Sequence, residues 1–220
     1  AMDPQQRVLL QCVWEALEDA CVRPSDLAGT NVGVYVGASM TDHGNALAND
    51  PEIADGYSMT GNSLSVISNR VSHVFDFHGP SVTLDTACSS SLYALHAAAQ
   101  ALTSGEIETA IVGATNAMLS PTNFVGFAEA RMLSPTGLCQ AFSNNADGYV
   151  RGEGMIAFVL RRQDPGEAAP LQSYGRLVHV GVNTSGSTIN IAMPSADAQF
   201  GLLDKVYNDA GFDPNDLAFV

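Results

Sequence analysis

Apolar residues recur along this chain with two alternating spacings, and these spacings predict its secondary structure. Helical spacing, with apolar residues three or four positions apart, marks five segments: Gln5 to Ala20; the stripe Leu64, Ile67, Val71, Val74 and Phe75; the stripe Leu92, Leu95, His96, Ala99 and Leu102, which Gly105 ends; Phe124 to Met132; and the stripe Phe200, Leu203, Val206, Tyr207 and Ala210, between a Ser195 cap and Gly211. Short apolar or alternating runs predict five strands: Val32 to Gly37, the alternating run from Ser81 that turns directly into a helix at Cys88, Ile107 to Gly113, Met155 to Leu160 and Arg176 to Val180. Helices that alternate with strands indicate an α/β protein with a largely buried sheet.

The two ends of the chain interrupt this alternation. The chain begins on a helix with no strand before it, and Leu217 to Val220 has the pattern of a strand that is just entering a core. We therefore expect residues 1–220 to be a fragment of a longer protein, forming one large domain or a large piece of one.

The composition argues against two classes of function. Apolar residues make up 46% of the 220 positions and charged residues 15%, which is typical of a compact soluble protein. No apolar run has the length needed to cross a bilayer. The formal charge is −14, with Lys205 as the only lysine. Because phosphate binding needs clustered cations, this charge argues against nucleic acid as a partner.

Cys88 is the strongest candidate for chemistry, because it lies where a predicted strand turns directly into a predicted helix. Val82 and Leu84 share one face of the strand, and three serines that suit the polar first turn of a helix follow the cysteine. The helix dipole and the unpaired N–H groups would favour a thiolate there. The alanines of that helix make it slim enough to pack closely and to hold its start rigidly: Ala94, Ala97, Ala98 and Ala101. The alternative is a thiol that fills the core as a small apolar residue.

The other three cysteines are interpreted as ordinary thiols. Cys12 and Cys21 flank a helical pattern, which indicates core or helix-end positions, and Cys139 lies in a polar stretch. No two cysteines have the close spacing of a zinc or redox motif, and no secretory apolar region is present. The thiols are therefore interpreted as reduced and the protein as cytoplasmic.

A nucleophilic cysteine generally needs a base or a cation nearby, and the spacing of the histidines supplies none. His96 lies eight residues after Cys88 on the same predicted helix, which corresponds to about 12 Å of rise, so it is interpreted as a core histidine. The remaining histidines lie in a polar loop, before the Cys88 strand and within a strand: His43, His73, His78 and His179. The residues alone therefore indicate an activated thiol with no assigned base.

Two polar stretches are weaker candidates. Arg151 to Gly154 is glycine-rich but lacks the strand-then-helix setting of a nucleotide loop, so it is interpreted as a tight turn before the strand from Met155. Asn144 to Gly148 resembles a calcium loop in composition only, because it lacks the carboxylates of an EF-hand.

Short motifs spread over almost the whole chain occur in the order of a known family. They are Asp3-Pro4-Gln5-Gln6-Arg7, Ser65 to Val71, His78-Gly79-Pro80, Asp85-Thr86-Ala87-Cys88-Ser89-Ser90-Ser91, Ala141-Phe142, Asp147-Gly148, Arg151-Gly152-Glu153-Gly154 and Gly181-Val182-Asn183. Together they resemble the β-ketoacyl synthases, and within them the ketosynthase domains of type I polyketide synthases.

The resemblance implies a thiolase-like layered α/β/α fold, of which this chain would hold mostly the N-terminal half and the connection into the second half, and it implies a homodimer. It identifies Cys88 as the residue that takes an acyl chain from an acyl carrier protein, for decarboxylative condensation with a malonyl-type extender. It also implies that the domain binds no cofactor, that its substrates arrive on the phosphopantetheine arm of the carrier, and that other polyketide synthase domains flank it. A helix start at Cys88 could offer the backbone N–H of that residue to a developing oxyanion.

Parts of the family pattern are absent from this sequence. The family has an N-terminal strand and two histidine-bearing segments that do not occur here, so residues 1–220 would be a partial ketosynthase domain that is incomplete for condensation. Ser187 to Pro194 also departs from the family pattern. Two alternatives stay open: a fatty-acid ketosynthase or other thiolase-fold enzyme, such as a coenzyme A thiolase, and a non-catalytic structural or dimerisation segment in which Cys88 is buried.

Overall fold

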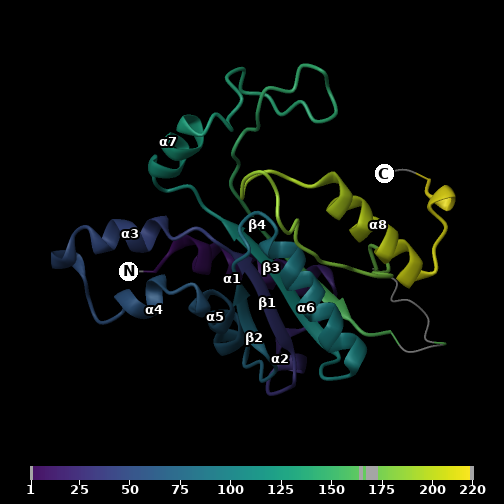
Figure 1. The fold of residues 1–220 in the computed structure, drawn as a ribbon. Coiled ribbons are helices and arrows are strands. Elements are labelled where there is room, and N and C mark those ends of the chain that lie inside the picture. The colour runs from purple at the N-terminus through teal and green to yellow at the C-terminus, as the bar shows by residue number, and fades with distance from the viewer. Residues whose placement is uncertain (1, 164–165, 167–172, 219–220) are drawn as a thin grey trace.

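Four strands form one mixed sheet at the centre of the molecule. In the computed structural model, which describes residues 2–163, 166 and 173–218, they are β1 (Gly33–Ala38), β2 (Ser81–Leu84), β3 (Thr109–Asn116) and β4 (Gly154–Arg161). Their spatial order is β2-β1-β3-β4 (Figure 1). β1 runs parallel to β2 and β3, and β4 runs antiparallel to β3. The three parallel strands therefore end at the same edge of the sheet.

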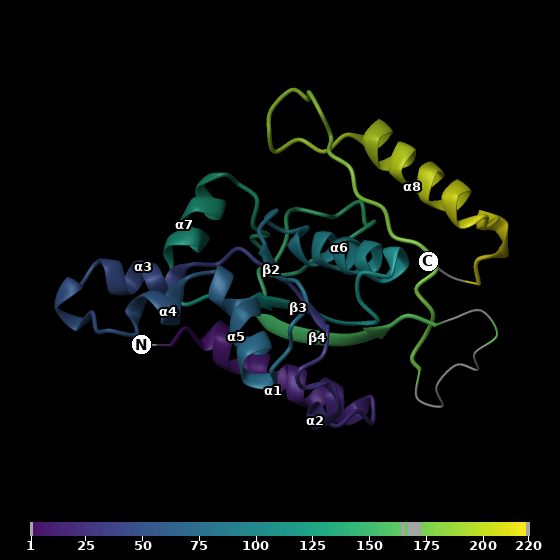
Figure 2. The ribbon, with the colours of Figure 1, turned by 90° about the horizontal axis from the view of Figure 1, so that it is seen from below.

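Helices cover both faces of this sheet. α1 (Pro4–Asp19), α2 (Pro24–Leu27) and α5 (Ser65–Phe75) lie on one side, and α6 (Ser90–Ser104) lies on the other (Figure 2). The other helical elements are α3 (Asp42–Ala48), η1 (Pro51–Ile53), α4 (Ser58–Asn62), α7 (Thr122–Glu129), α8 (Ala196–Ala210) and η2 (Pro214–Asp216). The predicted layered α/β/α arrangement is confirmed.

Strand β1 separates two apolar cores, because all six of its residues are buried. The first core joins α1 and α5 to the sheet: Leu9, Val13, Leu17, Val32, Val34, Val36, Ala38, Ile67, Val71, Phe75, Phe77 and Ile111. The second joins α6 to the sheet: Tyr35, Ala94, Ala98, Ala101, Leu102, Ile107, Ala110 and Val112. Successive side chains of a strand point to opposite faces, so β1 contributes to both cores.

The predicted residues end α6 and bound α8, and Asp3, which was not predicted as a cap, begins α1. The carboxylate of Asp3 accepts a hydrogen bond from the backbone N–H of Gln5 at 2.8 Å, and proline occupies the first position of α1. Gly105 ends α6 and Gly211 ends α8, both in the left-handed backbone conformation. The hydroxyl of Ser195 caps α8 by accepting from the N–H of Ala198.

The predicted strand from Arg176 to Val180 is wrong. Residues 176–180 form no ladder, and Val178 is 62% exposed. An apolar pattern makes a strand only where a neighbouring strand can complete its hydrogen bonds. Here the segment runs beside α6 instead, where the carbonyl of Val180 lies 3.1 Å from Nδ1 of His96, and Tyr93 donates its hydroxyl proton to the carbonyl of Asn183.

Three apolar patterns were assigned to the wrong environment. Leu92 is 60% exposed, whereas Leu102 of the same stripe is buried beside Ala94, Ala98 and Ala101, so only part of the predicted stripe faces the sheet. Phe200 is 72% exposed, and α8 instead places Leu202 and Val206 against Gly181. Leu217 and Ala218 belong to no strand, while residues 219–220 lie outside the described part of the chain.

The first turn of α6 lies directly against β1 at Gly37. A Cβ atom added to Gly37 would lie 2.5 Å from the backbone nitrogen of Ser91 and 2.6 Å from the carbonyl carbon of Ser90. Both are backbone atoms, which a side-chain rotation cannot move away. Glycine is therefore needed here so that the helix start can reach the sheet.

We expect Gly37→Ala to lower the free energy of unfolding by about 1–3 kcal/mol, because a methyl group would overpack this contact. Chemical denaturation followed by circular dichroism measures the change. Gly126→Ala is the control, since nothing lies within 4 Å of a Cβ at that position in α7, and alanine should raise stability there by about 0.5–1 kcal/mol. Equal effects at the two positions would contradict the packing argument.

Candidate active site

The segments that follow the three parallel strands gather at one edge of the sheet. β1 continues to Met40 and Asp42, β2 continues to Cys88, and β3 continues to residues 117–121. β4 begins at the same edge, because Gly154 pairs with Asn116 at the end of β3. Open α/β sheets bind ligands outside the carboxyl ends of their strands, so this edge is the candidate site.

Cys88 lies in a five-residue turn between β2 and α6. The strand ends at Leu84, and α6 begins at Ser90 after its cap residue Ser89, so the predicted direct passage from strand to helix is wrong. The turn needs Ala87 in the left-handed region, at φ 54°, which costs an L-residue roughly 1–2 kcal/mol. Cys88 itself is exposed and forms no disulfide. The interpretation of Cys88 as a buried core thiol is therefore excluded.

Side chains around the turn hold it in this strained form. The N–H of Ala87 donates to Asp85 Oδ1 at 2.9 Å. The hydroxyl of Ser90 donates to the carbonyl of Ala87 at 2.6 Å and accepts from the N–H of Thr86 at 2.8 Å. The hydroxyl of Ser89 donates to the carbonyl of Thr86. These serines therefore fix the turn that carries the thiol, rather than cap the N–H groups of α6.

Tyr149 is an electrostatic neighbour of Cys88. Burial raises the pKa of the Tyr149 hydroxyl, the positive charge of Arg151 lowers it, and negative charge on Cys88 raises it again. The ring of Tyr149 meets the ring of Phe127 edge to face, with centroids 5.9 Å apart. This contact joins α7 to the segment that leads into β4.

A buried carboxylate supports the neighbouring wall of the site. Asp42 is 5% exposed. Its Oδ2 atom accepts from the N–H groups of Leu119 and Ser120 at 3.0 Å, and its Oδ1 atom accepts from Asn123 at 3.1 Å. Asp42 therefore fixes the segment that connects β3 to α7. Sequence reasoning missed this residue, although its position just after a buried strand was an available signal.

A second buried polar network lies beneath this edge, in the motif at the start of α1. The side-chain amide of Gln5 donates to Asp3 and to the carbonyl of Met40, and it accepts from the hydroxyl of Thr115. Gln5 thereby joins α1 to the ends of β1 and β3. Satisfied polar groups of this kind specify one arrangement of a core, which gives the motif a structural role.

The histidines have partners elsewhere. His43 contacts Asn62, His78 contacts Asp76, His96 contacts the carbonyl of Val180, and His179 lies 3.6 Å from Asp209. His73 is exposed on α5. The expectation that no histidine pairs with Cys88 therefore agrees with these contacts.

The other cysteines occupy ordinary environments. Cys12 is half-buried; burial raises the pKa of its thiol, and the charge of Glu15 adds to the effect. Cys21 follows the end of α1, and Cys139 accepts a hydrogen bond from the N–H of Val150 at 3.0 Å. These placements agree with the interpretation of Cys12 and Cys21 as core or helix-end residues.

The asparagine-rich stretch contains a turn at residues 144–145, whereas residues 151–153 form an irregular segment before β4, so the predicted tight turn there is wrong. Gly154 is the first residue of β4, and the carboxylate of Glu153 accepts from the N–H of Met118 at 2.6 Å. Asp147 accepts hydrogen bonds from the hydroxyls of Ser134 and Thr136. Within residues 2–163, 166 and 173–218, no group of three or more metal-binding side chains lies together. Over the same residues, no helix is both long and apolar enough to span a membrane.

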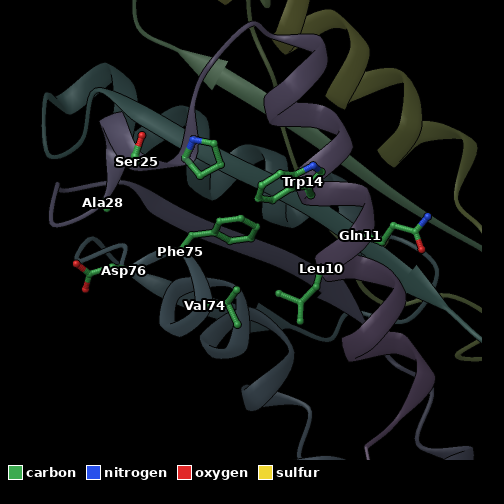
Figure 3. A pocket seen from close by; sticks show the side chains of 9 residues that line it. Leu10, Gln11, Trp14, Ser25, Ala28, Val74, Phe75 and Asp76 are labelled. Carbon is green, nitrogen blue, oxygen red and sulfur yellow. The ribbon is translucent and has the colours of Figure 1, made fainter.

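Two hollows lie away from Cys88. One, of about 480 Å³, lies between α1, α2 and α5, and Figure 3 shows Trp14 and Phe75 from two of these helices facing each other across it. The other, of about 1770 Å³, lies between α6, the end of β4 and residues 173–182. Cys88 lines neither hollow, so the candidate site is the open edge of the sheet.

Comparison with known proteins identifies the family. The profile described as "Beta-ketoacyl synthase, N-terminal domain" matches residues 1–165. The chain is 44% identical to the polyketide synthase ThaG of Burkholderia thailandensis, an alignment that covers all of this chain and 4% of that protein. It is 44% identical to the highly reducing polyketide synthase acrA of Aspergillus aculeatus, covering 97% of this chain and 9% of that protein.

Solved structures agree with these relatives. The ketosynthase from module 6 of the bacillaene synthase of Bacillus subtilis matches with a TM-score of 0.84 and 37% identity, over 97% of this chain and 36% of that one. The oxazolomycin ketosynthase domain OzmH KS7 of Streptomyces albus matches with a TM-score of 0.85 and 35% identity, over 98% of this chain and 37% of that one. The chain thus spans about a third of these structures and a small part of the curated relatives. It belongs to the β-ketoacyl synthase family, and within that family to the ketosynthases of type I polyketide synthases.

Proposed function

We propose that this chain is the acyl-accepting part of a polyketide ketosynthase and that Cys88 is its nucleophile. The observation that carries the proposal is the position of Cys88: an exposed thiol on a strained, hydrogen-bonded turn, at the carboxyl edge of the sheet and directly before a 15-residue helix. A rigid turn of this kind presents a sulfur to a substrate without a conformational search.

The proposed first step is a thioester exchange. The thiolate of Cys88 attacks the carbonyl carbon of an acyl thioester, a new C–S bond forms, and the carrier thiolate leaves and takes up a proton. The positive end of α6 would stabilise the oxyanion that develops during attack. No metal or cofactor enters this step, because the activated leaving group is already present in the thioester.

The proposed second step uses a malonyl-type extender. Loss of carbon dioxide from the extender gives an enolate carbon, which attacks the Cys88 thioester, forms the new C–C bond and releases the cysteine thiolate. The histidines described above contact groups other than Cys88. We therefore assign the acylation step to residues 1–220, as a partial ketosynthase domain, and assign the decarboxylation machinery to other parts of a complete ketosynthase.

The proposed partners follow from this chemistry. An acyl carrier protein would deliver both substrates on its phosphopantetheine arm, and further polyketide synthase domains would flank the chain. None of its four cysteines, all of which are described, forms a disulfide, which fits a reducing compartment such as the cytoplasm. A homodimer is supported by β2, which stands at the end of the sheet with one edge open. A second copy of the same strand could pair with that edge across a twofold axis.

We expect Cys88→Ala to abolish acylation of the chain by an N-acetylcysteamine thioester of a short fatty acid, because the alanine side chain has no nucleophile. Intact-mass spectrometry detects the acyl adduct. Cys139→Ala is the matched control and should acylate like the wild type, since the thiol of Cys139 is held by the N–H of Val150. An unchanged adduct on the Cys88 variant would refute the proposed nucleophile.

The order of thiol alkylation gives a second prediction. With limiting iodoacetamide near pH 7.5, Cys88 should be modified before Cys12, because Cys88 is exposed, whereas Cys12 is half-buried and its pKa is raised by burial. A raised pKa leaves less thiolate at a given pH, so Cys12 should catch up only as the pH increases. Peptide mapping measures both rates, and faster modification of Cys12 would count against the assigned environments.

We expect Val82→Asp to shift the chain from dimer to monomer, because Val82 lies on the edge strand β2 and is 37% exposed. A charge on an edge strand opposes pairing with a second copy. Light scattering after size-exclusion chromatography measures the mass. Phe200→Asp, on the exposed side of α8, serves as the control, and a wild-type chain that is monomeric at tens of micromolar would overturn the proposed dimer.

A further inference from the structure

Helix α7 is held to the molecule by a small number of side chains. None of its residues is buried, and it lies apart from the sheet, at the carboxyl edge of the parallel strands (Figures 1 and 2). Val125 is 59% exposed and Phe124 is 38% exposed. Because α7 has no buried residue, its position depends on the hydrogen bond from Asn123 to Asp42 and on the contacts of its aromatic residues.

Arg151 makes two of these contacts. The central carbon of its guanidinium lies 4.7 Å from the ring centroid of Phe124 and 5.2 Å from that of Phe127. A guanidinium over the faces of aromatic rings is attracted by their quadrupoles. One cation thus holds two residues that lie three positions apart on α7, which is one face of that helix.

The charge of Arg151 has no other evident use in the described part of the chain. It forms no ion pair there, and its Nη1 atom is buried with no hydrogen-bond partner among those residues. Its Nη2 atom contacts the sulfur of Met40 at 3.7 Å. The nearby carboxylate of Asp42 is taken up by Leu119, Ser120 and Asn123. A buried donor without a partner is unfavourable. Among the described residues, the contacts of the guanidinium with the two rings are therefore the interactions that favour an arginine at this position.

The contacts continue from Arg151 to Tyr149. The ring of Phe127 meets the ring of Tyr149 edge to face, at an interplanar angle of 75°. Tyr149 lies in the segment that leads into β4, and β4 begins at the same edge of the sheet as the turn that carries Cys88. In agreement with this placement, negative charge on Cys88 raises the pKa of the Tyr149 hydroxyl. A shift of α7 would therefore remove the packing partner of Tyr149 at this edge.

We propose that Arg151 is a positioning residue for the acylation of Cys88: its guanidinium fixes α7 through Phe124 and Phe127, and Phe127 fixes the ring of Tyr149 at the mouth of the site. Arg151 acts through these rings and does not touch the reacting atoms. The proposal rests on the proposed function, because it assumes that Cys88 accepts the acyl group.

The test compares acylation rates of the wild-type chain with those of Arg151→Met, Arg151→Lys and Phe127→Leu. The probe is the N-acetylcysteamine thioester of a short fatty acid, varied in concentration, and intact-mass spectrometry follows the adduct. We expect Arg151→Met to lower the saturating rate constant about tenfold, with little change in the half-saturating concentration, because it displaces the ring beside the thiol. Lysine keeps a cation over the rings, so Arg151→Lys should stay within about threefold of the wild type.

A double variant decides whether Arg151 acts through Phe127. If it does, Arg151→Met combined with Phe127→Leu should be no slower than the slower single variant, because both changes break the same chain of contacts. Effects that multiply would overturn the proposal. Thermal unfolding of every variant, with Arg7→Met on α1 as the matched control, separates lost folding from lost positioning.

Each remaining outcome is also decisive. A wild-type rate for Arg151→Met, measured where the wild-type chain is acylated, would refute the positioning role and leave the proposed function intact. If Arg151→Met does not fold, Phe127→Leu alone decides, because it must slow acylation while Arg151 is unchanged. A wild-type chain that accepts no acyl group would refute the proposed function itself.

Discussion

The contact between the first turn of α6 and strand β1 is the constraint on which the rest of this structure depends. The helix reaches the sheet because its inner face is alanine and because Gly37 has no side chain, so that backbone meets backbone. Cys88 lies only two residues before α6. The same contact therefore places the turn that carries Cys88 beside the end of β1. A larger residue at this junction would move the helix start and the thiol together.

The candidate site is assembled from segments that the sheet brings to one edge. Cys88 comes from the turn after β2, Asp42 from the segment after β1, and Tyr149 and Arg151 from the chain that leads into β4. None of these residues is close to another in sequence except the last two. Parallel strands necessarily end at the same edge, and the antiparallel strand β4 starts there, so the topology alone explains why the four residues converge.

Two kinds of support surround the thiol, and they differ in strength. Beneath it, Gln5 and Asp3 are buried and satisfied by several hydrogen bonds, which makes that part of the site rigid. Beside it, α7 is attached through the carboxylate of Asp42 and the guanidinium of Arg151, with no buried apolar face. A helix that is attached by few contacts can be displaced at low cost. For this reason, the guanidinium of Arg151 is proposed to contribute strongly to the position of α7.

Local pattern was sufficient for the longer helices α1, α5, α6, α7 and α8 and for the four paired strands, but it missed the short helices α2, α3 and α4. Helical spacing and capping residues act over a few positions, so Gly105, Ser195 and Gly211 were recognisable without any tertiary information. Pattern failed at residues 176–180, where the strand signal was present but no neighbouring strand completes a ladder. It also misplaced Leu92 and Phe200, because periodicity gives a face of a helix but not what covers that face.

The sequence by itself determined which elements form, the order in which they occur and the presence of a cysteine at a helix start, since these depend on interactions between near neighbours. Only the tertiary structure decided that Ala87 takes a left-handed conformation, that the serines brace the turn, and that Tyr149 and Arg151 lie at the site. The physical reason is separation along the chain. The contacts of Phe127 with Tyr149 and with Arg151 form only after the sheet has aligned its strands, and no local spacing records them.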